Sequence, residues 1–144
     1  MTQLNDDFES VVSHLLQFKG RVIITGIGKS GIIAQKLVAT FNSTGTPAVF
    51  MHAADAIHGD LGLVQKEDVV LCISKSGNSP EIKALTPLIH SLGAPLIGMV
   101  GNTDSHLALQ SRWVLDATVE KEACPLDLAP TRQAQPLKWP WAMP

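Results

Sequence analysis

The chain has 144 residues, of which 45% are hydrophobic and 17% charged, which suits one domain with an ordinary core and excludes two full domains. Its 11 basic and 13 acidic residues give a net charge of −2, which disfavours a nucleic-acid-binding module. The apolar stretches are shorter than the roughly 20 residues of a bilayer span, and the N-terminus lacks a signal pattern, so we expect a cytoplasmic protein with no membrane partner. The two cysteines, Cys72 and Cys124, lack metal-ligand spacing and are expected to be free thiols.

Short apolar strands alternate with helical patterns along the chain. Apolar residues recur at three- and four-residue steps between Asp6 and Phe18, at Phe8, Val11, Val12, Leu15 and Leu16, which predicts an amphipathic helix. The patterns further predict strands over 21–26, 48–51, 68–74, 94–100 and 113–117, helices over 30–41, 79–92 and 105–110, and mainly loop over 52–62. Strands joined by helical crossovers pair in parallel, so we expect a three-layer α/β/α sandwich with a five-stranded parallel sheet.

A glycine-rich turn, GIGKSG, follows the first predicted strand at residues 26–31. Its three glycines match the dinucleotide-binding fingerprint. However, Met51 and His52 stand after the second strand, where that fold needs an acidic side chain to hold a ribose. A P-loop is disfavoured because Ile23 occupies the place of its first glycine. Alone, the motif is also consistent with a tight turn between a strand and a helix.

A second turn, SKSGNSPE, follows the third predicted strand at residues 74–81. It places the hydroxyls of Ser74, Ser76 and Ser79 around Gly77, directly before a helix. The first turn of a helix has unpaired N–H groups and the positive end of a dipole, so this arrangement predicts a phosphate cradle that needs no metal. Ser79 also fits an ordinary N-cap followed by Pro80, and that reading is compatible with the cradle.

These turns, together with NSTGTPAVFMHAADAIHGDLG (42–62) and EKEACPLDLAPT (120–131), resemble the sugar isomerase (SIS) domain, and more narrowly the arabinose-5-phosphate isomerase family. The resemblance implies a flavodoxin-like sandwich that interconverts ribulose 5-phosphate and arabinose 5-phosphate in the Kdo pathway, for lipopolysaccharide or capsule. It also implies a phosphorylated sugar as partner, no metal or redox cofactor, and a homo-oligomer, tetramer or dimer, with sites at subunit interfaces.

The resemblance also assigns roles to individual residues. The catalytic residues would be Lys29, Glu81, Glu122 and His58, and the phosphosugar would be bound by Gly28, Ser30, Thr46, Ser74, Ser76, Gly77 and Ser79. The reaction would pass through an enediolate, which requires a carboxylate base and a cation facing the developing oxyanion. Lys29 fits the cation. Either glutamate fits the base, and we prefer Glu122 because the helix dipole stabilises the charged form of a first-turn carboxylate such as Glu81.

Simpler explanations exist for several of these residues. Glu81 would also stabilise its helix as a first-turn acid, and His58 would also fix its loop as a hydrogen-bond donor. A non-catalytic phosphosugar sensor is the alternative function; Lys29 and the two glutamates favour the enzyme. An oxidoreductase domain is a further alternative, which Met51 and His52 oppose.

The family resemblance covers residues from about Arg21 to Thr131 and stops there. The last segment, RQAQPLKWPWAMP (132–144), replaces the hydroxyl-rich stretch and long helix of the family, and neither the family's second acid/base histidine nor its CBS repeats follow. A shifted reading of the possible codons for 132–144 permits a family-like sequence, so we hypothesise a frameshift product, which sequencing the gene would test. The expected organisation is an SIS domain over 1–131 and a non-family tail, with phosphosugar binding better retained than turnover.

Overall fold

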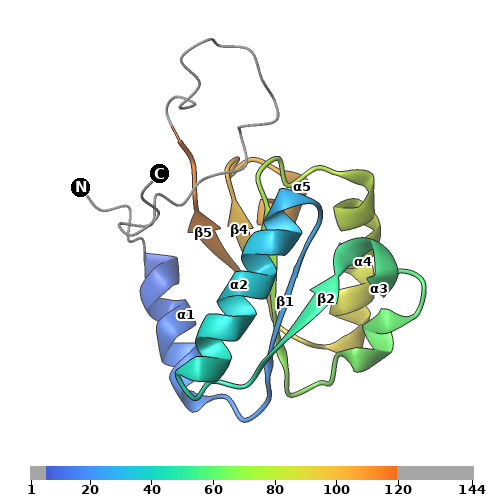
Figure 1. Cartoon of the computed structure of the whole chain (residues 1–144). Coiled ribbons are helices and arrows are strands. Elements are labelled where there is room, and N and C mark those ends of the chain that lie inside the picture. The colour runs from blue at the N-terminus through green and yellow to red at the C-terminus, as the bar shows by residue number, and fades with distance from the viewer. Residues whose placement is uncertain (1–5, 120–144) are drawn as a thin grey trace, which may run out of the picture.

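The computed structural model describes residues 6–119, in which five strands form one parallel sheet between two layers of helices (Figure 1). The strands are β1 (Val22–Gly26), β2 (Ala48–His52), β3 (Val69–Ser74), β4 (Leu96–Val100) and β5 (Trp113–Asp116). Their order in the sheet is β2-β1-β3-β4-β5, and all neighbours pair in parallel. The expected α/β sandwich is confirmed.

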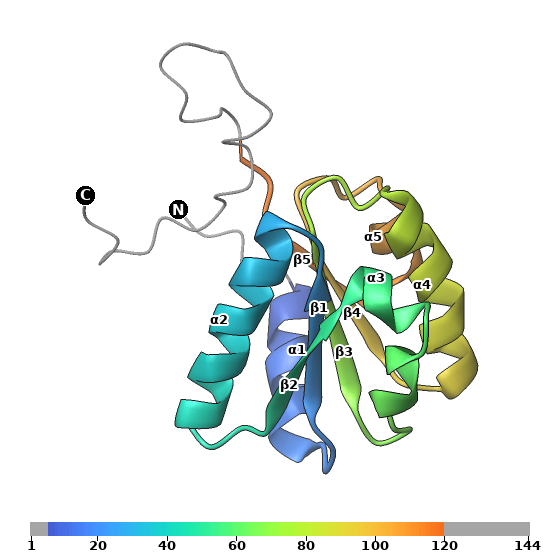
Figure 2. The same ribbon diagram turned by 45° about the vertical axis from the view of Figure 1, so that its right-hand side comes forward.

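Helices cover both faces of the sheet (Figure 2). Helices α1 (Asp6–Gln17) and α2 (Lys29–Ser43) lie on one face, and α3 (Ala53–Ala56), α4 (Pro80–Leu92) and α5 (His106–Gln110) lie on the other. Two short elements, α3 and the 3₁₀ turn η1 (Asp60–Leu63), fall in the stretch expected to be mainly loop, because four residues are too few to show a helical period. None of the helices within residues 6–119 has the length and apolar character to cross a membrane.

The sheet separates two apolar cores. One core contains Ile23, Leu85 and Leu96 on the α4 side, and the other contains Ile24 and Leu71 on the α2 side. Strand β3 is buried along its whole length, as expected for a central parallel strand covered on both faces.

The apolar stripe predicted on α1 is buried less completely than expected. Val11 is 4% exposed, whereas Phe8, Val12 and Leu16 are 41%, 40% and 81% exposed. The reason is position: α1 packs on β5, the last strand of the sheet, so only one side of its apolar stripe meets the core.

A buried carboxylate joins the starts of β1 and β3. Asp68 is 2% exposed and accepts hydrogen bonds from the backbone N–H groups of Arg21 (2.8 Å) and Gln65 (2.9 Å) and from the Arg21 guanidinium (2.8 Å). Burial acts to raise the pKa of Asp68, but the hydrogen bonds from Arg21 and Gln65 outweigh it, so the pKa lies below its ordinary value. The charged form therefore links the two strands.

This lowered pKa predicts a pH dependence of stability. A carboxylate whose pKa is lower in the folded state stabilises the fold above its unfolded pKa of about 4, and the contribution is lost as pH falls through the folded pKa. We therefore expect the free energy of unfolding, measured in urea, to decline below about pH 4, and this decline to be smaller in Asp68→Asn. An equal decline in both proteins would contradict a role for this carboxylate in acid unfolding.

Candidate functional site

A cavity of about 540 Å³ opens beyond the carboxyl ends of β1, β3 and β4. Strands β1 and β3 are neighbours, but the chain leaves β1 toward α2 on one face and β3 toward α4 on the other. The loops that follow them therefore diverge and leave a crevice, which is where doubly wound sheets bind ligands. The volume lies within the range of small-molecule sites.

The turn between β1 and α2 forms one wall of the cavity through Ile27 and Ser30. Gly28 precedes α2 with φ +55°, a conformation that favours glycine. At Gly26, a side chain would press on the backbone of Ser30 and of Ile73, 3.0 and 3.1 Å away. The glycines of GIGKSG thus serve a tight turn, and the exposed residues Gly28 and Lys29 flank the cavity wall without lining it.

Residues 74–79, which join β3 to α4 and form the serine loop, bring the three predicted serines, Ser74, Ser76 and Ser79, to the cavity. The Ser74 hydroxyl accepts a hydrogen bond from Gly77 N–H (3.0 Å), and the Ser76 hydroxyl accepts one from Asn78 N–H (3.3 Å). Ser79 occupies the N-cap position of α4, yet its side chain makes no capping hydrogen bond. Within residues 6–119, each of these hydroxyls therefore keeps its own O–H to donate to a ligand.

The first turn of α4 adds a positive dipole end and a carboxylate to the same cavity. Pro80 is the first helical residue, and Glu81 and Ile82, whose N–H groups lie in that first turn, line the cavity. Hydroxyl donors and a helix N-terminus together favour an anion. Half-buried Glu81 lies beside them, so the cavity can hold an anionic group and present a carboxylate to the rest of the ligand.

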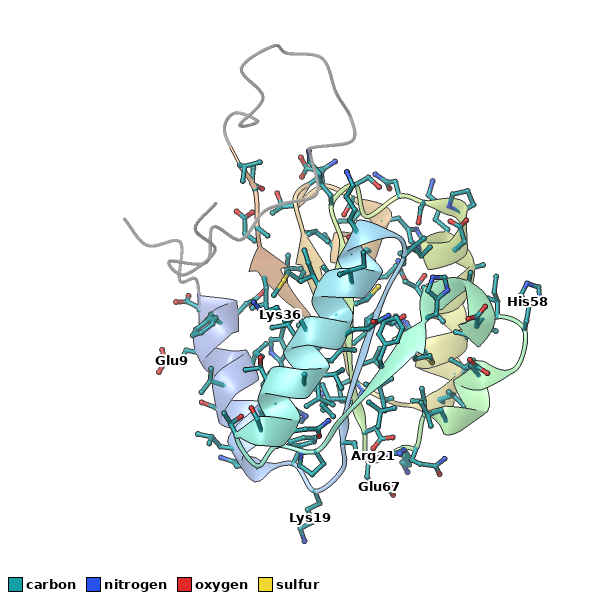
Figure 3. The ribbon with its side chains drawn as sticks, in the orientation of Figure 1. Glu9, Lys19, Arg21, Lys36, His58 and Glu67 are labelled. Atoms are coloured by element: carbon teal, nitrogen blue, oxygen red, sulfur yellow. The ribbon has the colours of Figure 1, made fainter. Side chains whose placement is uncertain are left out.

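The structure does not bring Thr46 and His58 into this cavity. Thr46 follows the C-terminal end of α2, whose 15 residues extend about 20 Å from the site. Thr46 therefore lies near the amino ends of the strands, opposite the cavity. His58 follows α3, is exposed, and projects away from the domain (Figure 3). Gly77 belongs to the serine loop but is buried against Ser105 and does not line the cavity. Glu122, Cys124 and residues 132–144 lie outside the described residues.

The cavity also contains residues that sequence reasoning missed. Lys75 is half-buried and lines the cavity, together with Gly101 and Asn102. Gly101 and Asn102 directly follow β4. The rule that ligands bind at the carboxyl ends of parallel strands therefore predicts a place for them at the site. Residues 6–119 hold no cluster of three or more histidine, cysteine or acidic side chains placed to bind a metal.

The structure is a doubly wound α/β domain in which three serines and the first turn of α4 line a cavity at the point where the strand order reverses. The sequence pattern of the SIS domain family matches residues 15–135, so the chain belongs to the SIS domain family.

Among curated proteins, the chain is 51% identical over 131 residues to arabinose 5-phosphate isomerase KdsD of Pseudomonas aeruginosa, and 46% identical over 129 residues to arabinose 5-phosphate isomerase GutQ of Escherichia coli K12. The alignments cover 91% and 90% of this chain but only 40% of each relative. Among solved structures, an E. coli CFT073 protein in complex with arabinose 5-phosphate superimposes with a TM-score of 0.85 and 42% identity, over 93% of this chain and 71% of that one.

Proposed function

We propose that this domain binds a pentose phosphate and interconverts ribulose 5-phosphate and arabinose 5-phosphate without a metal. The observation that carries the proposal is the presence of three serine hydroxyls, the first turn of α4 and the carboxylate of Glu81 in one cavity. The relatives named arabinose 5-phosphate isomerase and the structural neighbour in complex with arabinose 5-phosphate support the choice of sugar.

In the proposed mechanism the phosphate monoester accepts hydrogen bonds from Ser74, Ser76, Ser79 and the first-turn N–H groups of α4. The sugar chain then extends from this fixed end toward Glu81 and the turn that carries Lys29. A carboxylate, from Glu122 or Glu81, removes the proton from the carbon beside the carbonyl and returns it to the former carbonyl carbon. A second proton moves between the two oxygens, so the enediolate collapses to the isomer. Lys29 would stabilise the negative oxygen of that intermediate.

We further propose that the protein acts as a homo-oligomer in the cytoplasm and supplies arabinose 5-phosphate for Kdo. Exposed apolar side chains on α1 and α2, such as Leu16 (81%) and Ile32 (67%), support contact with another copy. The expectation that these 144 residues turn substrate over weakly stays a prediction.

The decisive experiment follows ribulose 5-phosphate in deuterated water by NMR. An isomerase exchanges the transferred carbon-bound hydrogen with solvent, so we expect deuterium in both pentose phosphates. Calorimetric titration should also show both sugars binding more tightly than inorganic phosphate. Binding without exchange would favour the phosphosugar sensor, and equal affinity for inorganic phosphate would remove the support for a pentose.

A matched pair of lysine variants serves as the control for this experiment. Lys29→Met removes the cation proposed to face the oxyanion, and we expect exchange to slow by about a hundredfold, the effect of losing one oxyanion donor. Lys36→Met removes a lysine from the same helix two turns further on, and exchange should stay within a factor of two (Figure 3). Equal rates in the two variants would contradict the role of Lys29.

A further inference from the structure

The serine loop is held from outside by the segment that leads into α5. Three backbone N–H groups of this segment donate to residues 75–78. Gly101 N–H donates to the Lys75 carbonyl (3.0 Å), His106 N–H to the side-chain oxygen of Asn78 (3.0 Å), and Leu107 N–H to the Gly77 carbonyl (3.0 Å). The orientation of the loop therefore depends on α5 as well as on β3 and α4.

Asn78 is the one side chain in this set of contacts, and both ends of its amide are used. Its Oδ1 accepts from His106 N–H (3.0 Å), and its Nδ2 donates to the Ser76 carbonyl (3.1 Å). The same residue's backbone N–H donates to the Ser76 hydroxyl (3.3 Å). Asn78 does not line the cavity, whereas Ser76 does. The hydrogen bonds of Asn78 therefore act on the cavity through Ser76.

The partner of Asn78 is itself anchored. The Nε2 atom of His106 lies 2.9 Å from the hydroxyl of Thr86, a residue of α4 that is 1% exposed. Ser105 caps α5 by accepting a hydrogen bond from Ala108 N–H (3.3 Å). The start of α5 is therefore a fixed support against which the Asn78 amide can hold the loop.

We propose that Asn78 is a positioning residue for the phosphate of the ligand: its amide ties Ser76 to the start of α5 and so fixes the donors of the cradle before a ligand arrives. The inference rests on the proposed function of the same cavity. Without the amide, the loop would have to be ordered during binding, and that ordering cost would be subtracted from the affinity.

The test compares Asn78→Ala with Asn42→Ala. Asn42 makes the same kind of paired amide contact, with the N–H (2.8 Å) and carbonyl (2.9 Å) of Ala48, at the opposite edge of the sheet. Both variants should lose a similar amount of thermal stability. Only Asn78→Ala should bind inorganic phosphate more weakly by calorimetry, by about tenfold, which is the value of one or two hydrogen bonds.

Hydrogen exchange provides a readout that does not need a ligand. In Asn78→Ala the amide hydrogen of His106 loses its acceptor and should exchange faster. In Asn78→Asp, which keeps that acceptor, it should stay protected even if Asn78→Ala folds poorly. Equal phosphate affinity in Asn78→Ala and Asn42→Ala, or equal protection in Asn78→Ala and Asn78→Asp, would overturn the positioning role alone. A wild-type protein that binds neither phosphate nor phosphosugar would overturn both this inference and the proposed function.

Discussion

Asp68→Ala is expected to lower the free energy of unfolding by about 3 kcal/mol, near the lower end of the range for breaking a buried ion pair. The variant leaves the backbone N–H groups of Arg21 and Gln65 without their acceptor and removes the partner of a guanidinium. The Arg21 side chain is 35% exposed and can turn to water, which limits the loss. Urea denaturation at neutral pH measures the effect.

Glu67→Ala is the matched control for this prediction. Glu67 precedes Asp68 in the chain, is exposed, and lies at the same edge of the sheet (Figure 3). Removing its carboxylate should change the free energy of unfolding by less than about 0.5 kcal/mol, as surface substitutions usually do. Similar losses of unfolding free energy in the two variants would mean that the hydrogen bonds and the ion pair of Asp68 do not stabilise the fold.

Gly77→Ala is expected to affect both stability and ligand binding. Gly77 has φ +63°, and a β-carbon there would overlap the side chain of Ser105 at the start of α5. The strained backbone and the overlap together should cost about 2–4 kcal/mol of unfolding free energy. Relieving the overlap moves the serine loop away from α5, so binding of inorganic phosphate should fall by more than tenfold. Urea denaturation and calorimetry measure the two effects.

Gly45→Ala separates backbone strain from side-chain overlap, the two causes of the effect expected for Gly77→Ala. Gly45 also has a positive φ, +88°, but a β-carbon there would meet no atom within 4 Å. This variant should therefore show only the backbone strain, about 1–2 kcal/mol, with phosphate affinity unchanged. If Gly77→Ala binds phosphate as well as Gly45→Ala does, the packing of the loop against α5 is not needed for the cradle.

The fold could be predicted because the central strands are apolar on both faces and each is followed by a recognisable turn or helix. Strand β3 was predicted one residue from its observed start, at Asp68 instead of Val69. The exposure of Phe8, Val12 and Leu16 could not be predicted, because helical periodicity shows which side of α1 is apolar but not how far the sheet beneath it extends.

The candidate site was predictable where it is local in the chain and unpredictable where it is not. Ser74, Ser76 and Ser79 lie within six residues, so the sequence shows them together. Asn102 joins them only because β4 pairs with β3, and the contact of Asn78 with α5 joins residues 28 positions apart. Thr46 and His58 came from a family resemblance, which aligns residues along a chain without placing them in space.

The buried Asp68 and the serine loop lie at opposite ends of the same strand, β3, about 20 Å apart for its six residues. One end of β3 secures the sheet while the other lines the proposed ligand cavity, so mutations accumulating at one end need not disturb the other. Such a division of labour leaves the side chains that line the cavity open to evolutionary change, provided that Gly77 and Asn78 keep the loop against α5, and it offers protein engineers a scaffold whose recognition can be redesigned at those positions.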